Sequence, residues 1–122
     1  MTPVELLPKV RARSILDAVQ HYPCALRISS IIPGHRCSGQ DTVVGAHLPT
    51  IGKGVNTKVS DILVAAACDN CHSLLDGRDN RIHWIIANYP TIFYERLMRG
   101  HHETMGRWVE DGLLSVEGME VV

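Results

Sequence analysis

The sequence lacks any long apolar run and any recognisable secretory signal. No stretch approaches the ~20 consecutive apolar residues that a membrane-spanning helix needs. The N-terminal stretch MTPVELLPKVRARS carries an acidic residue early and its arginines late, whereas a secretory signal has a basic start followed by an apolar segment. We therefore expect a cytoplasmic protein that does not enter a membrane. Because disulfides are rare in a reducing cytosol, its four cysteines are expected to be metal ligands.

The chain also carries little net charge. At −1, bulk electrostatic attraction alone would not hold it to nucleic acid. Its 122 residues, 45% hydrophobic and 20% charged, are typical of one globular domain and too few for two. No repeat, low-complexity segment or linker divides the chain, so we expect a single domain over residues 1–122.

Capping signals and apolar periodicity predict a mixed α and β chain. Thr2 and Pro3 open a helix over residues 3–21. The segments 24–32 and 42–48 are rich in β-branched residues, which predicts a pair of strands. A short helix is expected from Asp69 to about Leu75, with Gly77 as its stop, and the closing helix over about 89–111. The closing helix is expected to bury an apolar stripe of Phe93, Leu97, Met105 and Trp108.

The four cysteines fall into two groups. Cys24 and Cys37 lie on the predicted strand and the loop after it, while Cys68 and Cys71 form a Cys-x-x-Cys knuckle directly before His72. Two such groups separated by a long insert are typical of a tetrahedral zinc site with four thiolate ligands. Two other interpretations stay open: Cys24 is a buried core thiol, or the knuckle and His72 attach a c-type haem. Haem would leave Cys24 and Cys37 unexplained, so we expect structural zinc and no haem.

Helix geometry separates His72 from Cys71. Neighbouring residues on an α-helix point about 100° apart, whereas Asp76, four residues on, shares a face with His72. A histidine nitrogen and a carboxylate oxygen placed in this way can bind a hard divalent cation such as Mg²⁺ or Mn²⁺. The competing interpretation is a solvated His–Asp pair on an exposed helix.

His47 ends the predicted strand 42–48, just before a polar loop. A side chain at such a position can be exposed while its backbone is held. The zinc cysteines on either side of it in sequence would fold this strand against the helix that starts at Asp69. A neutral imidazole there could activate water for attack on a phosphodiester. A purely structural histidine is the competing interpretation.

The order of these residues resembles that of the HNH, or His-Me finger (ββα-metal), endonucleases. The matching series is Cys24, Cys37, Ala46-His47-Leu48, Cys68-x-x-Cys71-His72. The segments CALRI, GAHL, KVSD and ACDNCHSLLDGR resemble, more narrowly, the YbcO-like nucleases carried by prophages and phages. The likeness is strong from about Cys24 to Asp76 and fainter through RGHHETMGRWVEDGLL.

This resemblance implies an α+β fold, a small zinc-stabilised ββα-metal finger with flanking helices, and a core motif over residues 24–78. It implies that His47 is the general base and His72 a ligand of the catalytic metal. Ala46 departs from the pattern, because many members have an acidic metal ligand there, and the usual Asn is replaced near Ser60-Asp61. The oxygen ligand is therefore expected from Asp61 or Asp76, and phosphate contacts from Lys58 and Arg78.

The resulting prediction is a phage- or prophage-encoded, metal-dependent endonuclease that hydrolyses phosphodiester bonds in DNA, with branched DNA and RNA as further candidate substrates. The alternative is a non-catalytic zinc module that binds nucleic acid or another protein, an interpretation favoured by Ala46 and the nearly neutral charge. A homodimer is also expected, because Trp84, Ile85 and Ile86 could form an exposed apolar patch.

Overall fold

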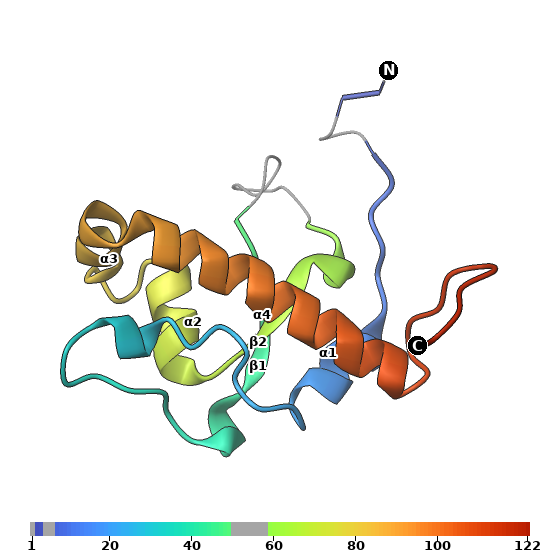
Figure 1. Ribbon diagram of the computed structural model, residues 1–122, viewed down its shortest axis with the longest axis horizontal. Coiled ribbons are helices and arrows are strands. Elements are labelled where there is room, and N and C mark those ends of the chain that lie inside the picture. Colours follow the sequence, from blue (N-terminus) through green and yellow to red (C-terminus); the bar gives the residue numbers. More distant parts are fainter. Residues whose placement is uncertain (1, 4–6, 50–58) are drawn as a thin grey trace.

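The computed structural model describes residues 2–3, 7–49 and 59–122, in which helices surround a short antiparallel hairpin (Figure 1). The fold is α+β, as predicted. In chain order the elements are helix α1 (Arg13–Val19), 3₁₀ turns η2 (Ser29–Ile31) and η3 (Gln40–Thr42), strand β1 (Val44–His47), 3₁₀ turn η4 (Asp61–Leu63), strand β2 (Val64–Ala67), and helices α2 (Asp69–Leu75), α3 (Ile82–Asn88) and α4 (Pro90–Glu110). No helix among these elements is long and apolar enough to cross a membrane.

The hairpin pairs β1 with β2, and His47 at the end of β1 lies opposite Val64. The strand predicted over residues 42–48 is therefore present, but it is shorter and covers Val44–His47. The strand predicted over residues 24–32 is wrong, because that segment forms a loop and η2. Arg27 explains the difference, since its φ of 50° lies in the left-handed region and interrupts an extended backbone.

The 24–32 segment nevertheless covers the free edge of β2. The backbone N–H groups of Ala25 and Leu26 both donate to the carbonyl of Ala66, at 2.8 and 3.3 Å. Two successive N–H groups that donate to the same carbonyl indicate a bend in the chain, because in a β-ladder each carbonyl takes its own donor. The bend thus provides hydrogen-bond donors to the Ala66 carbonyl at the free edge of β2 without adding a strand to the sheet.

Local capping sets the ends of α2 and α4. Helix α2 spans the predicted residues, and Gly77, with a φ of 85°, ends it. Pro90 occupies the first turn of α4. At its other end Gly112, with a φ of 74°, and Leu113 donate to the carbonyls of Val109 and Trp108, which is the hydrogen-bond pattern of a Schellman motif. The closing helix therefore agrees with the prediction over about 89–111.

The N-terminal helix is much shorter than predicted. It covers Arg13–Val19 instead of residues 3–21, and residues 7–12 are not helical; residues 4–6 lie outside the described part. Val10 donates its backbone N–H to the Ser60 hydroxyl, and Ala12 donates to the Asp61 carboxylate. These backbone groups are bonded to a distant segment, so they are not available for helical hydrogen bonds.

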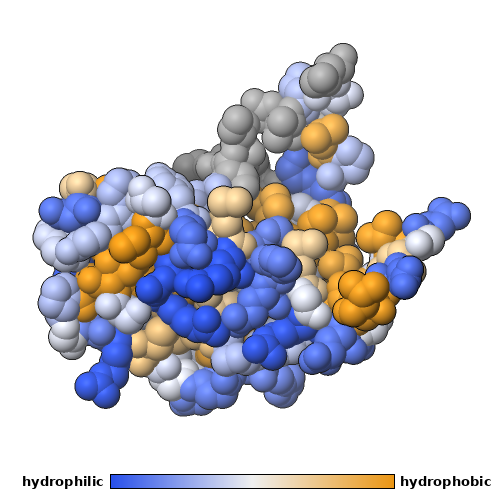
Figure 2. Space-filling view, viewed as in Figure 1, coloured by the Kyte–Doolittle hydropathy of each residue, from blue (hydrophilic) through white to orange (hydrophobic). Residues whose placement is uncertain are grey.

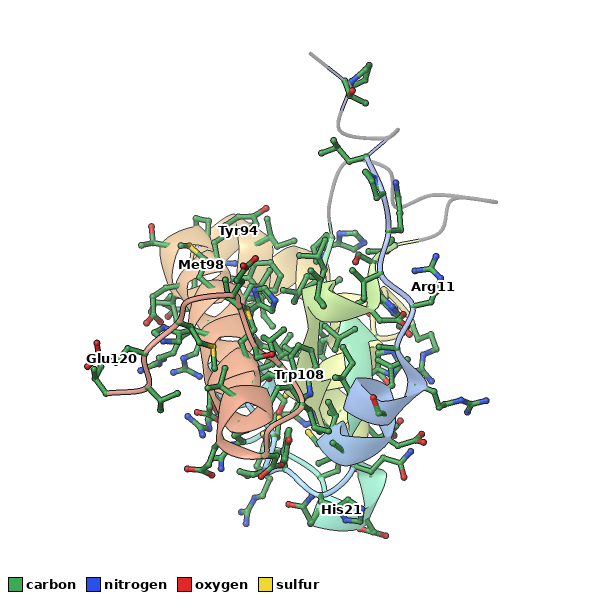
Figure 3. All side chains as sticks on the ribbon, turned by 90° about the vertical axis from the view of Figure 1, so that its right-hand side faces the viewer. Arg11, His21, Tyr94, Met98, Trp108 and Glu120 are labelled. Atoms are coloured by element: carbon green, nitrogen blue, oxygen red, sulfur yellow. The ribbon has the colours of Figure 1, made fainter. Side chains whose placement is uncertain are left out.

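The core lies between the hairpin and the helices on its two sides, α4 on one and α1 on the other (Figure 3). Trp108 of α4 is fully buried and donates its indole N–H to the Ile15 carbonyl of α1 at 3.1 Å. The predicted stripe is buried except for Met105, which is only partly buried. Gly100 allows α4 to approach closely, because a Cβ there would lie 3.0 Å from the Ala25 carbonyl oxygen. This close approach packs α4 against the bend at Ala25 and Leu26 that is bonded to β2.

Candidate functional site

The four cysteines come together from three parts of the chain. Cys24 follows α1, Cys37 precedes η3, and Cys68 and Cys71 lie at the start of α2. All four are free thiols, and their Sγ atoms lie within 4.8 Å of one another. The Sγ of Cys37 lies 3.8 Å from that of Cys24 and 3.7 Å from that of Cys71. A tetrahedral zinc with Zn–S bonds of about 2.3 Å has S···S edges of about 3.8 Å. The cluster therefore fits a single metal ion such as zinc.

Backbone and hydroxyl donors surround these sulfurs. The N–H groups of Ser29 and Ser38 point to Cys71 and Cys68, each at 3.4 Å. The Ser29 hydroxyl lies 3.2 Å from the Cys71 sulfur. Such donors stabilise the thiolate form that a metal requires. Burial acts in the opposite direction: together with the neighbouring cysteines it outweighs these donors and raises the pKa of the Cys37 thiol to about 11, so a thiolate at this position needs a bound cation.

His47 stands beside a buried carboxylate. Its Nε2 lies 3.5 Å from Oδ1 of Asp61, and the two side chains are 36% and 8% exposed. Asp61 opens η4, which leads directly into β2, the strand paired with β1. The hairpin thus brings together two residues that the sequence separates by a loop. His47 is thus partly accessible to solvent while one of its ring nitrogens lies beside a carboxylate.

His72 and Asp76 lie on one face of α2, as predicted. Nε2 of His72 is 3.7 Å from Oδ2 of Asp76, and both side chains are 33% exposed. Cys71, directly before His72, is fully buried. The helix therefore turns the thiol inward and the imidazole toward solvent. One nitrogen and one oxygen donor at this separation fit a partly hydrated divalent cation.

The two predicted phosphate contacts have different outcomes. Lys58 lies outside the described residues. Arg78 is exposed, and its Nε donates to both carboxylate oxygens of Asp76, at 3.1 and 2.9 Å. Partial burial opposes ionisation of Asp76, but the backbone and guanidinium N–H groups of Arg78 outweigh it and lower the pKa of this carboxyl. Asp76 is thus anionic and already paired, and a metal would share it with Arg78.

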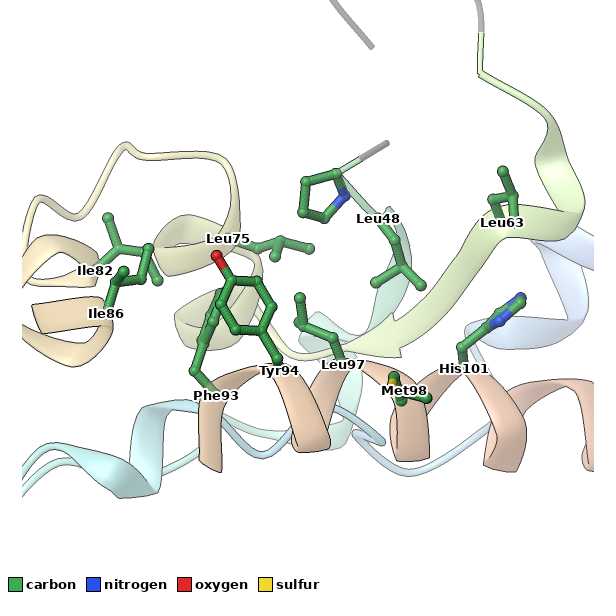
Figure 4. Close-up of a pocket in the computed structure, with 11 residues that line it drawn as sticks. Leu48, Leu63, Leu75, Ile82, Ile86, Phe93, Tyr94, Leu97, Met98 and His101 are labelled. Carbon is green, nitrogen blue, oxygen red and sulfur yellow. The ribbon is translucent and has the colours of Figure 1, made fainter. Parts of the chain in front are cut away.

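The surface of the described residues has two cavities of different character. An open cavity of about 820 Å³ has apolar walls, with Phe93, Tyr94 and Leu97 on α4 facing the ends of the hairpin and α2 (Figure 4). His101 of α4 also lines it and donates from Nε2 to the Ile62 carbonyl at 2.7 Å. The second, about 530 Å³, is polar and includes Arg78. Neither cavity is lined by His47 or His72, so the common cleft expected for these two histidines stays a prediction.

Sequence reasoning missed three residues that support the site. Ser60 accepts a hydrogen bond from Val10, His101 holds the turn that contains Asp61, and Thr104 accepts the N–H of Ala66 in β2. Each acts across a large sequence separation. No local pattern marks such residues, because serine and threonine are mostly surface residues and histidine is intermediate.

Two known proteins resemble the chain in sequence. One is "Putative nuclease YbcO" of Escherichia coli (strain K12), and the other is "Putative nuclease ybcO" of Enterobacteria phage 82. Each is 31% identical to the chain over 93 residues, which cover 75% of this chain and 85% of the relative. No protein-family profile matches the chain, and no solved structure matches it.

Proposed function

Because the chain belongs to the YbcO-like nuclease family, we propose that it is a metal-dependent endonuclease of the HNH, or His-Me finger, type. Its substrate is DNA, including branched DNA, with RNA as a further candidate. The chain forms one nuclease domain over residues 1–122, is encoded by a phage or prophage, and acts in the cytoplasm. The order of an antiparallel hairpin followed at once by α2 supports the ββα-metal assignment.

The observation that carries the proposal is the placement of His47 on this hairpin. It ends β1, is partly exposed, and lies against a carboxylate. The cysteine cluster fixes the start of α2, which follows β2 with no intervening loop. A structural zinc held by Cys24, Cys37, Cys68 and Cys71 thus fixes the helix of His72 relative to the hairpin of His47.

Each side chain then has a defined task. His47 takes the proton of a water molecule, the resulting hydroxide bonds to phosphorus, and the bond from phosphorus to the leaving oxygen breaks. The leaving oxygen takes a proton from solvent, and the imidazolium returns its own proton to solvent. His72 and Asp76 would hold Mg²⁺ or Mn²⁺, which supplies positive charge for the developing phosphorane. Arg78, whose guanidinium is exposed and paired with Asp76, would contact a phosphate of the substrate.

A second candidate function is a non-catalytic zinc module that binds nucleic acid or another protein. Ala46 favours it, because this residue stands directly before His47 and its side chain is fully buried in the core. The position therefore offers no oxygen ligand to a catalytic ion. A module of this kind would bind a partner and leave plasmid DNA intact.

Plasmid cleavage with added Mg²⁺ or Mn²⁺ separates the two functions. For the nuclease, His47→Ala lowers the cleavage rate by about 10²- to 10⁴-fold, the usual contribution of a general base. Zinc content and the circular dichroism spectrum stay those of the wild type. The matched control is His102→Ala, since His102 is an exposed histidine of α4. A His47→Ala protein that cuts at the wild-type rate contradicts the proposed mechanism.

The same assay tests the metal ligand. His72→Ala is expected to abolish cutting or to raise the Mg²⁺ concentration needed for half-maximal cutting, because it removes one of two donors. It is expected to retain zinc, since its imidazole faces away from the cysteine cluster. Loss of zinc together with loss of activity would assign His72 to the structural site instead.

A further inference from the structure

The polar cavity of about 530 Å³ is a surface hollow between α2, the loop after η2 and the turn that leads from α2 to α3. Among the described residues, its lining carries two guanidinium groups and a single carboxylate, so the lining is cationic although the whole chain has a net charge of −1. The other lining groups are amide, hydroxyl and imidazole side chains. A hollow of this composition fits an anion that has several oxygen atoms.

The carboxylate of the lining, Asp79, is already hydrogen-bonded to Arg81. Its Oδ1 accepts the backbone N–H of Arg81 at 3.1 Å and Nε of the same residue at 3.0 Å, and its Oδ2 accepts Nη2 at 2.7 Å. This fork holds the Arg81 guanidinium in one orientation, so less side-chain entropy is lost when a ligand binds to it. Asp79 therefore orients a cation and is not an isolated negative charge in the pocket.

Several donors of the pocket have no partner in the described part of the chain. The side-chain hydrogen bonds of Arg78 use Nε, and those of Arg81 use Nε and Nη2, so Nη1 of both residues makes none. The hydroxyl of Ser73 and the side-chain amide of Asn80 donate to no described residue either. Arginine, serine and asparagine side chains are common donors to phosphate oxygens in protein–DNA complexes.

The pocket adjoins the face of α2 that carries His72 and Asp76. Arg78 belongs to both, since it lines the pocket while its Nε bonds to the Asp76 carboxylate. Ser73, on the pocket side, directly follows His72, so the two side chains point about 100° apart around the helix. A strand whose cleaved phosphate lies at the His72 face can therefore bring a neighbouring phosphate to the pocket. The hollow is open, which suits a ligand that continues beyond it, whereas small-molecule sites bury most of their ligand.

We propose that this pocket binds a backbone phosphate of DNA beside the one that is cleaved, with Arg81 as its main cationic contact and Ser73 and Asn80 as neutral donors. Arg78 then lies between the two phosphate positions. The identity of the ligand as DNA rests on the proposed nuclease function. Because these contacts are made to the backbone, the pocket adds affinity without sequence preference.

The test is a double variant that leaves the net charge unchanged. Asp79→Asn with Arg81→Gln removes the guanidinium and its carboxylate together, and the asparagine can still accept the backbone N–H of position 81. Fluorescence anisotropy of a labelled DNA duplex, with zinc-loaded protein and no added Mg²⁺ or Mn²⁺, measures Kd. We expect Kd to rise about 10-fold, the equivalent of one charge-assisted hydrogen bond, for each of two duplexes of unrelated sequence. The salt dependence of log Kd is expected to become shallower by about one.

The matched control is Glu95→Gln with Arg99→Gln, which removes an exposed ion pair of α4 that lines neither cavity. Its Kd and salt dependence are expected to equal those of the wild type. A second measurement uses the wild-type protein and does not depend on the double variant folding. The ¹H–¹⁵N resonance of the Arg81 Nε–H, assigned by comparison with Arg81→Lys, is expected to shift when the duplex is added.

Four results overturn the proposal. They are an unchanged Kd in the pocket double variant, an equal loss in the control, a loss that differs between the two duplexes, and an Arg81 resonance that responds to inorganic phosphate or AMP but not to the duplex. The last result would assign the pocket to a free anion. Failure of the proposed function looks different, because the wild type would then leave DNA intact while the binding measurements still test the pocket.

Discussion

Cys68 and Cys71 are completely buried, yet a zinc site requires both as thiolates. The protein provides N–H donors from Ser29 and Ser38 to these sulfurs. Without the cation, the four close sulfurs would repel one another once ionised. The free energy of metal binding is therefore part of the free energy of folding for this cluster.

Cys71→Ser is expected to release zinc and to unfold the segments that the cluster joins. Structural zinc contributes about 10–16 kcal/mol in small finger peptides, which is comparable to the whole stability of a typical domain. Metal content by mass spectrometry and helicity by circular dichroism check this. His72→Ala, at the next residue, is the control that keeps its zinc. A folded Cys71→Ser protein with one bound zinc would contradict the four-ligand site.

At the scale of elements, α4 supplies a polar group to the buried strand β2. The hydroxyl of Thr104 accepts the N–H of Ala66 at 3.0 Å and donates to the Gly100 carbonyl at 2.8 Å. All residues of β2 are buried, so the N–H of Ala66 cannot form a hydrogen bond with solvent. Helix α4 thus packs against the sheet and also provides a hydrogen-bond acceptor for the edge of β2.

Thr104→Val keeps the shape of the side chain and removes its hydroxyl. It leaves the buried N–H of Ala66 without an acceptor, a loss of about 1–3 kcal/mol. Urea unfolding of the zinc-loaded protein measures the change in the free energy of unfolding. Thr104→Ser, which retains the hydroxyl, is the paired variant and is expected to lose less. Equal losses in the two variants would mean that the methyl group matters more than the hydrogen bond.

The ends of α1 and α4 are joined by a second polar contact. Tyr22, just after α1, donates its hydroxyl to Asp111 at 2.6 Å. Burial, and then the hydrogen bond to Asp111, raises the pKa of Tyr22 from its usual 10 to about 12. A raised pKa means that the folded state favours the neutral phenol. The stability from this contact is therefore complete below pH 10 and is lost as the pH rises from 10 to about 12.

Tyr22→Phe is expected to cost about 1 kcal/mol of stability near neutral pH. The difference from the wild type should stay constant up to about pH 9 and shrink above pH 10, because the wild type alone loses the contact. Chemical denaturation across this pH range is the measurement, and Tyr94→Phe, at an exposed tyrosine, is the control. A difference that grows with pH would have the wrong sign for a raised pKa.

At the scale of the whole molecule, polar side chains cover the middle of one face, whereas apolar side chains gather toward both of its ends (Figure 2). The apolar patch predicted at Trp84, Ile85 and Ile86 is only partly correct. Trp84 and Ile86 are exposed at 41% and 37%, but Ile85 is fully buried. Helix α3 turns Ile85 into the core, since residues adjacent in a helix point in different directions.

The expected homodimer stays a prediction. Light scattering coupled to size-exclusion chromatography, over a range of protein concentrations, is expected to show a mass that rises toward twice 13.5 kDa. Trp84→Ser and Ile86→Ser should weaken this association because they remove exposed apolar area. A constant monomer mass at the highest concentration would show that the prediction is wrong.

The sequence by itself determined the features that depend on local geometry. The range of α2 followed from a start at Asp69 and a stop at Gly77, and the α-helix period placed His72 and Asp76 on one face with Cys71 turned inward. The four cysteines were identifiable because two groups of cysteines separated by a long insert are typical of a metal site. These signals act over a few residues, and at α2 the packing of the chain agrees with them.

Only the tertiary structure decided which distant segments pair or form hydrogen bonds with each other. It gave β1 its partner in β2 and not in residues 24–32, because the left-handed Arg27 interrupts the latter. It shortened the first helix, since residues 10–12 bond to Ser60 and Asp61 instead of to their own helix. It placed the carboxylate of Asp61 beside the imidazole of His47 and not on the face of α2 that carries His72. Hydrogen bonds across dozens of residues depend on how the whole chain packs, and no local pattern in the sequence encodes them.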